Sequence, residues 1–189
     1  MLFRSVEEDP RIDWFSAADR VKRRGVIDEL VDMTRKADRL RGKYTAVDTQ
    51  LTTYQTAWKG PGSKPADSVQ KAADNLKAKL AELKPLFAQR GPGGAAAAEG
   101  GGGVSPEELA KPEPDFVLPG IAQRIQGAIR DLESISAAPG KVQLQQFELI
   151  KVALADATRL VDKLVTEDVA QLNKAMTDAK VPYLAIPER

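Results

Sequence analysis

Histidine and cysteine are both missing from this sequence of 189 residues. Without histidine there is no imidazole general base, no serine–histidine relay and no histidine-ligated metal. Without cysteine there is no thiolate nucleophile, no disulfide and no cysteine-based zinc or iron–sulfur site. The catalytic options that remain are oxygen-ligated cations and acid–base chemistry by carboxylates.

An excess of charge of one sign is also missing, because 28 basic side chains face 27 acidic ones. A net charge of +1 argues against a nucleic-acid-binding protein, which usually carries a surplus of Lys and Arg on one face. No apolar run approaches the roughly 18 residues of a membrane-spanning helix. The first residues also lack the pattern of a signal peptide. Aromatic residues make up only 5% of the chain, so we expect a core of Leu, Ile, Val and Ala.

Apolar residues recur with helical spacing over long stretches. The first pattern begins at Ser16, a suitable N-cap, and ends at Trp58. Its apolar residues alternate three and four apart, which indicates a long helix with one buried seam. Gly25 and Gly42 fall on the opposite face. The seam comprises Val26, Leu30, Met33, Ala37, Leu40, Tyr44, Val47, Leu51, Tyr54 and Trp58.

Three further helices follow by the same reasoning. The Gly- and Pro-rich residues 59–65 end the first helix, and a second helix is expected over residues 65–89, with Pro85 kinking or ending its last turn. A third is expected over residues 120–137 and a fourth over residues 142–180. The seam of the fourth slips by one residue between Leu164 and Val165, which we attribute to gradual drift of a straight helix against a strict heptad. The second seam is Val69, Ala73, Leu76, Leu80, Leu83 and Phe87; the third is Ile121, Ile125, Ala128, Leu132 and Ile135.

These patterns predict an all-α fold, an antiparallel four-helix bundle made of two helical hairpins joined by a Gly/Pro-rich disordered linker. A two-stranded coiled coil between chains is the alternative, and the short turns favour hairpins within one chain. The expected segments are an N-terminal extension over 1–15, hairpin 1 over 16–90, the linker over 91–118, hairpin 2 over 119–180 and an extended C-terminal tail over 181–189. Because the tail is apolar, we expect it to pack on another surface.

Candidate chemistry is sparse. The run from Gly91 to Gly103 lacks the strand and the Gly-Lys-Ser/Thr step of a phosphate-binding loop, so it is interpreted as linker. The acidic clusters fall mostly in expected loops and are interpreted as solvated charge, because a carboxylate pair must be held in a pocket to do acid–base work. No catalytic, cofactor-binding or metal-ligating residue is predicted. The clusters are Glu7-Glu8-Asp9, Glu107-Glu108, Glu113 with Asp115, and Glu167-Asp168.

Other notable residues have structural interpretations. The basic residues between Arg20 and Lys43 are interspersed with acidic ones at helical spacing, which indicates ion pairs on a wet face. Tyr44, Tyr54 and Trp58 lie on the seam and are interpreted as core. Asn173 stands in a helix interior, where Asn is unfavourable, so we expect it to bond a nearby backbone group or the tail rather than a ligand.

Five short stretches, taken in order, resemble the C-terminal helical region of bacterial proteins that carry a BNR/WD-repeat, sortilin-like β-propeller and are described as glycosyl hydrolase- or sialidase-like. The chain departs from that pattern at Gly140 and Ala170. The stretches are Asp9-Pro10-Arg11, Ala72-Ala73-Asp74-Asn75-Leu76, Ala122-Gln123-Arg124-Ile125, Ala137-Ala138-Pro139, and Val165-Thr166-Glu167-Asp168-Val169-Ala170-Gln171-Leu172-Asn173 before Ala179-Lys180-Val181-Pro182-Tyr183.

The resemblance implies a non-catalytic accessory or interaction domain at the end of a larger exported protein, periplasmic or secreted. Its partner would be the upstream β-propeller, where any hydrolase activity would reside, and no family site residue maps onto this chain. A free-standing coiled-coil adaptor or self-associating bundle is the alternative, and self-association stays open. Residues 1–5 lie outside the helical scheme. Because Leu2-Phe3-Arg4-Ser5 can be encoded by CTC-TTC-CGA-TCT, the end of a common sequencing adapter, they are either adapter read-through or an ordinary short N-terminus.

Overall fold

The computed structural model describes residues 16–60, 64–88, 119–135, 137–182 and 184. Every regular element among them is helical, so the predicted all-α fold class is confirmed. The predicted extension over residues 1–15, the linker over 91–118 and the last residues of the tail lie outside the described residues. The elements are α1 (Ala17–Ala57), α2 (Asp67–Phe87), α4 (Ile121–Glu133), α5 (Lys141–Lys163), the π-helical turn η2 (Leu164–Val169) and α6 (Ala170–Asp178).

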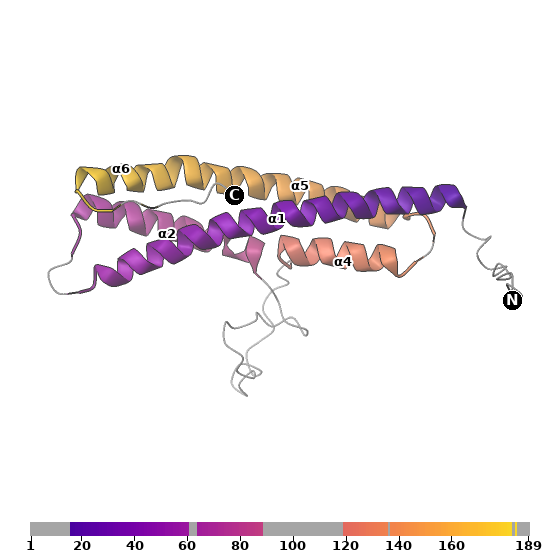
Figure 1. The fold of residues 1–189 in the computed structure, drawn as a ribbon, viewed down its shortest axis with the longest axis horizontal. Helices are drawn as coiled ribbons and strands as arrows, with labels where there is room; N and C mark the ends of the chain where they lie inside the picture. Colours follow the sequence, from indigo (N-terminus) through magenta and orange to yellow (C-terminus); the bar gives the residue numbers. More distant parts are fainter. Residues whose placement is uncertain (1–15, 61–63, 89–118, 136, 183, 185–189) are drawn as a thin grey trace, which may run out of the picture.

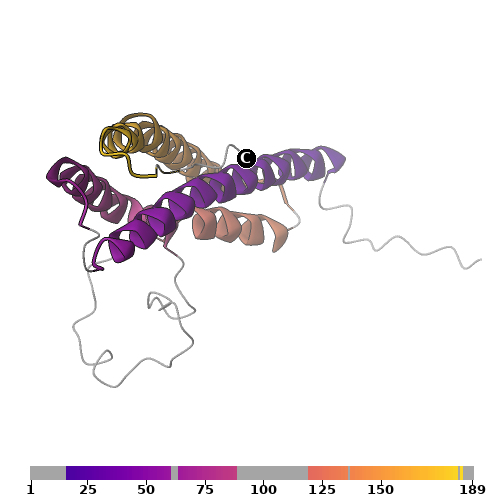
Figure 2. The same ribbon diagram turned by 60° about the vertical axis from the view of Figure 1, so that its left-hand side comes forward.

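The helices form two antiparallel hairpins, as predicted. In the first, the Tyr44 hydroxyl of α1 donates to the Leu80 carbonyl of α2. Gln55, further along α1, contacts Lys77, which comes before Leu80 in α2. The second hairpin joins α4 to α5. Figures 1 and 2 show that α1 and the continuous α5–η2–α6 helix run the length of the molecule in the same direction.

The two short helices lie one after the other along these two long ones (Figure 1). α4 packs against α1 and α5, whereas α2 packs against α1, η2 and α6. Within the described residues, a cross-section through either half of the rod therefore meets three helices. The four predicted helices share one continuous core. Beside the two long helices, α2 and α4 together take the place of a third.

The buried residues are those of the predicted seams. Ser16 is the N-cap of α1, and its side chain accepts a hydrogen bond from the Asp19 amide at 3.1 Å. On α1, seven seam residues between Leu30 and Leu51 are buried, while Gly25 and Gly42 are exposed. On α2 the buried residues are Val69, Ala73, Leu76, Leu80 and Leu83.

The third helix, expected over residues 120–137, is shorter in the structure. α4 ends at Glu133, so Ile135 lies beyond it and was wrongly placed on its seam. The Ser134 hydroxyl donates to the Asp131 carbonyl at 2.8 Å, a local bond that competes with continuation of the helix. The backbone carbonyl of Ile135 instead accepts a hydrogen bond from Arg23 of α1. Pro85 lies inside α2, which ends two residues later at Phe87, as its effect on the last turn predicts.

The one-residue slip in the last seam has a local cause. Leu164 and Val169 are both buried although they are five residues apart, the spacing of a π-helical turn. η2 takes up the extra residue, and α-helical spacing resumes with Leu172 and Met176. The slip therefore comes from one turn, and the gradual drift inferred from the sequence was wrong.

The start of the tail folds back onto α6. Lys180 has φ 55°, and the amides of Lys180 and Val181 bond the carbonyls of Thr177 and Met176, which is the Schellman pattern. The reversal brings Leu184 to a buried position beside Asn173. The Asn173 amide donates to the Leu184 carbonyl at 3.0 Å and its oxygen accepts from the Leu184 amide at 2.8 Å. Of the two partners expected for Asn173, a nearby backbone group or the tail, the structure shows the tail.

The end of α2 and the start of α4 lie next to each other. A Cβ added to Gly120 would lie 2.4 Å from the Ala88 carbonyl oxygen and 3.1 Å from that of Leu86. Only glycine allows this approach without movement of the backbone. The end of α2 and the start of α4 are thus in contact, although 31 residues separate Ala88 from Gly120 in the sequence.

This contact predicts opposite effects for two glycine substitutions. Gly120→Ala should lower the free energy of unfolding by about 1–3 kcal/mol, because the new methyl group overlaps backbone atoms that cannot rotate away. Gly127→Ala, inside α4 with no atom within 4 Å of its Cβ position, should raise it by about 0.5–1 kcal/mol. Urea unfolding followed by circular dichroism measures both. Equal effects of the two substitutions would contradict the contact.

Candidate interaction surface

Charged groups lie at the surface throughout the described part of the chain. None of its charged or polar side chains is buried, and it holds no group of three or more acidic residues arranged to bind a metal ion. Of the predicted acidic clusters, Glu167-Asp168 is described, while residues 7–9, 107–108, 113 and 115 lie outside the described residues.

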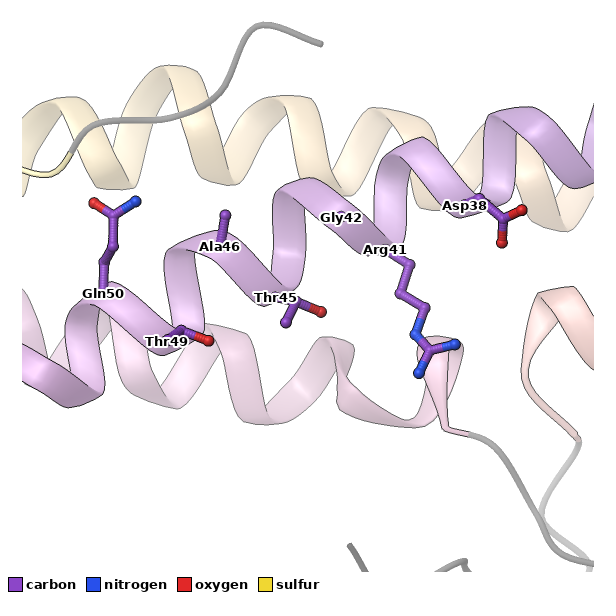
Figure 3. Close-up of a pocket in the computed structure, with 7 residues that line it drawn as sticks. All are labelled: Asp38, Arg41, Gly42, Thr45, Ala46, Thr49 and Gln50. Carbon is purple, nitrogen blue, oxygen red and sulfur yellow. The ribbon is translucent and has the colours of Figure 1, made fainter.

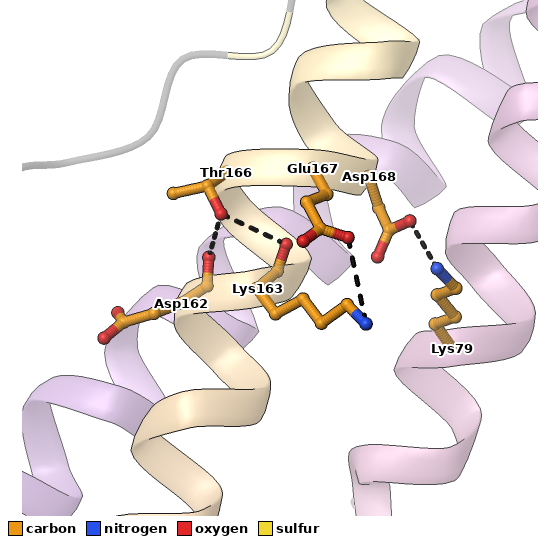
Figure 4. Close-up of polar contacts among 6 residues, drawn as sticks. All are labelled: Lys79, Asp162, Lys163, Thr166, Glu167 and Asp168. Carbon is orange, nitrogen blue, oxygen red and sulfur yellow. Dashed lines mark hydrogen bonds and ion pairs between the residues drawn. The ribbon is translucent and has the colours of Figure 1, made fainter.

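Several polar contacts gather at the π-turn (Figure 4). The Thr166 hydroxyl donates to the Asp162 carbonyl at 2.9 Å, and Lys163 lies 3.9 Å from Glu167. Asp168 faces α2, and its carboxylate accepts a hydrogen bond from Lys79. The sequence analysis interpreted this cluster as solvated charge. The Asp168 side chain is only 14% exposed, so its carboxylate is instead a contact between two helices.

The Lys79–Asp168 pair should make the protein less stable at strongly alkaline pH. The hydrogen bond to Asp168 raises the pKa of the Lys79 ammonium above its ordinary value of 10.5. The pair therefore contributes fully below pH 10.5, and its contribution is lost as the pH rises through the higher folded-state pKa. We expect Lys79→Gln to lower Tm slightly at pH 8, with a difference from the wild type that shrinks above pH 10.5. Lys71→Gln, an exposed lysine on the same helix, is the control; a difference that grows with pH would contradict this assignment.

A hollow of about 600 Å³ lies on the outer face of α1 (Figure 3). All the residues that line it belong to α1, and its centre is formed by small side chains between Arg41 and Gln50. Because no second helix contributes a lining residue, the hollow is a shallow surface and not an enclosing pocket. Its residues are Asp38, Arg41, Gly42, Thr45, Ala46, Thr49 and Gln50.

A groove of about 610 Å³ lies between α1 and α5. Its floor is apolar, with Met33 and Leu154 each 6% exposed, and its sides are charged. Lys151 of α5 pairs with Glu29 of α1 at 3.0 Å and lies 4.1 Å above the centre of the Phe147 ring. Glu29 and Lys151 thus hold α1 and α5 together, whereas Asp32 pairs with Arg35 of its own helix.

The outer flank of α5 carries exposed apolar residues that no core seam accounts for. Val142, Leu149, Val152 and Leu160 are 66%, 62%, 59% and 42% exposed and lie within one side of the helix, and we call these four residues the α5 stripe. Leu144, also 42% exposed, lies on another side of α5. Isolated exposed apolar residues are ordinary, but a row of them along one helix is typical of an interaction surface. The sequence contains this signal as a second apolar line beside the seam of the fourth helix. It was missed because one seam per helix was enough to predict the bundle.

The aromatic residues of the first helix are core residues to different degrees. Tyr44 is 9% exposed, stacks on Phe87 with ring centres 5.0 Å apart, and bonds the α2 backbone. Tyr54 and Trp58 stack on each other and are only partly buried at the edge of the core. They line neither of the two hollows described above.

Two of the basic residues of α1 form ion pairs within the helix on its wet face, as predicted for the whole set. Arg24 pairs with Asp28 at 3.0 Å and Arg35 pairs with Asp32 at 2.9 Å. Both pairs are exposed, so they contribute little to stability.

In the part of the chain that the structure describes, no helix has the length and apolar character needed to cross a membrane. A comparison with models of known protein families, with curated proteins and with solved structures finds no match to this chain.

Proposed function

We propose that this chain is a non-catalytic helical interaction domain that binds another protein surface through the α5 stripe. The observation that supports the proposal is the row of exposed apolar residues on a rod whose seams are otherwise buried against one another. Apolar side chains that stay in water when the core is complete gain most by contact with a partner.

We further propose that the partner protein is its own parent, an exported protein with a sortilin-like β-propeller upstream of this chain. The support for this is the resemblance of the five stretches. The longest of them, residues 165–173, contains most of the π-turn and the asparagine that holds the tail, two irregular features of the fold. The domain would pack on the propeller or space it from other surfaces.

Two tests address these proposals separately. Repeated Asp-box strands encoded directly upstream of Asp9 would support the parent, whereas an in-frame stop codon there would contradict it. Isothermal titration of the purified propeller with this chain should show binding that Leu149→Glu abolishes and the exposed control Val21→Glu preserves. Hydrolysis of glycosides by the isolated chain would overturn the non-catalytic assignment.

A free-standing adaptor or self-associating bundle is the second candidate. It is favoured by the exposure of the α5 stripe on the isolated chain. In that case the binding surface is the same but the parent is absent.

A further inference from the structure

The two short helices meet end to end near the middle of the rod (Figure 1). The Ala88 amide bonds the Pro85 carbonyl and closes α2, and the Gly120 carbonyl accepts the first hydrogen bond of α4, from the Arg124 amide at 3.1 Å. A continuous helix is stiff because each of its turns is hydrogen-bonded to the next. At the junction of α2 with α4 these bonds stop and begin again, so the two helices are held together there by contact.

The first long helix contains a glycine beside this junction. Tyr44 of α1 stacks on Phe87, the last residue of α2, with ring centres 5.0 Å apart. Gly42, two residues before Tyr44, is exposed, and no atom lies within 4 Å of its Cβ position. Packing therefore does not require a glycine there. Because glycine restricts the backbone least, α1 bends more easily at this position than at its neighbours.

The second long helix has its π-turn close to the same level. Lys43 of α1 lies 3.6 Å from Asp162, two residues before η2. Within η2, Asp168 accepts a hydrogen bond from Lys79 of α2 (Figure 4). π-turns are among the usual places at which helices bend. We call this section of the rod, which contains Gly42, η2 and the junction of α2 with α4, the waist.

The waist separates two halves of the rod that are each packed within themselves. On one side α4 packs against α1 and α5, and this half carries the α5 stripe. On the other side α2 packs against α1, η2 and α6, and this half carries the start of the tail, bonded to Asn173. A bend at the waist changes the angle between the stripe and the tail while the packing inside each half is kept.

The contact at the junction sets the direction in which the rod can bend. A Cβ on Gly120 would lie 2.4 Å from the Ala88 carbonyl oxygen, so the backbones at the two helix ends are already in contact. Bending that pushes these ends together is opposed by the repulsion of closely packed atoms. Bending that separates them meets no such obstacle at the junction.

We propose that the waist is a hinge, at which the rod bends in the direction that separates the end of α2 from the start of α4. Hinge motions occur on the microsecond to millisecond timescale, and a few residues absorb the change in backbone angles. Here Gly42 and η2 absorb it in the two long helices, and the junction opens between the two short ones. The inference goes beyond the proposed function, because it holds whichever partner binds the α5 stripe.

Double electron–electron resonance between pairs of spin labels measures the hinge in the full chain, which has no native cysteine. Labels at Glu82→Cys of α2 and Arg130→Cys of α4 span the junction, and labels at Lys141→Cys and Arg159→Cys lie within α5. Each of these positions is exposed. The first pair should give a distance distribution at least about twice as wide as the second, with the excess at longer distances, because the ends of α2 and α4 separate.

Two glycine substitutions form a matched test, since Gly42 and Gly25 are both exposed in α1 with no atom within 4 Å of the Cβ position. Gly42→Ala and Gly25→Ala should raise Tm by similar amounts, because alanine stabilises a helix interior relative to glycine. Only Gly42→Ala should narrow the distribution between positions 82 and 130, by at least about one third, because only this substitution stiffens α1 at the waist.

Equal widths for the two pairs of labels show a rod that does not bend at the waist and overturn the inference. Narrowing by both glycine substitutions or by neither, or an excess at shorter distances, also overturns it. Far-ultraviolet circular dichroism should be the same for every variant, which shows that a change in width is not unfolding. The proposed function is tested separately, by binding of the propeller and its loss in Leu149→Glu, so the two proposals can fail independently.

Discussion

Leu76→Asp should unfold the protein at room temperature. Leu76 is 1% exposed in the middle of α2 and belongs to the core that α2 shares with α1 and the last helix. The substitution removes a large apolar side chain and buries a carboxylate that has no partner, a change that costs several kcal/mol. Because a domain of this size is stable by only about 5–15 kcal/mol, the loss is a large part of the total.

The matched control is Ala78→Asp, which places the same carboxylate two residues along α2 on its exposed face. We expect its unfolding free energy to stay within about 0.5–1 kcal/mol of the wild type. Thermal melts followed by circular dichroism compare the two variants. Similar Tm values for both would show that the Leu76 face of α2 is not part of the core.

Deleting a single threonine should have opposite consequences in the two long helices. Removal of Thr166 takes one residue out of the π-turn, which can then close as an ordinary α-helical turn and keep Leu164 and Leu172 on the core side. Removal of Thr45, also exposed but within regular α1, turns half of that helix by about 100° relative to the other half. The buried residues before and after position 45 would then lie on different faces of α1, so they could not all pack in one core.

We therefore expect the protein without Thr166 to stay folded with a Tm close to that of the wild type. The protein without Thr45 should lose at least about 5 kcal/mol and be largely unfolded. Differential scanning calorimetry measures both. A cooperative transition in neither protein, or the same transition in both, would contradict the role assigned to the π-turn.

The seams could be predicted because burial on a helix repeats with a period that the sequence displays. Leu30 to Leu51 on the first helix and Val69 to Leu83 on the second are buried where the three–four spacing places them. Asn173 could be predicted as well, since a mid-helix asparagine needs a partner for its amide and a tail lies close by in the sequence.

Other features could not be predicted in the same way. A seam tells which face of a helix is covered but not which helix covers it, so the end-to-end placement of α2 and α4 needed the contact between Gly120 and Ala88. The slip near Leu164 is visible in the sequence, but drift and a π-turn leave the same one-residue offset. The α5 stripe was missed because its residues, unlike the seam, are recognised only once the core is seen to be complete without them.

Thiol reactivity at two neighbouring positions of α5 tests the central claim that one line of this helix is core and the other is a binding surface. In this cysteine-free chain, Leu149→Cys and Ile150→Cys each introduce one thiol, at sites that are 62% and 4% exposed. At submicromolar concentration, the thiol at 149 should react with a maleimide at least about 100 times faster than the thiol at 150, which is reached only by opening of the fold. Addition of the purified propeller should slow the reaction at 149, because a bound partner covers it. Equal rates at the two positions, or faster reaction at 150, would contradict the account.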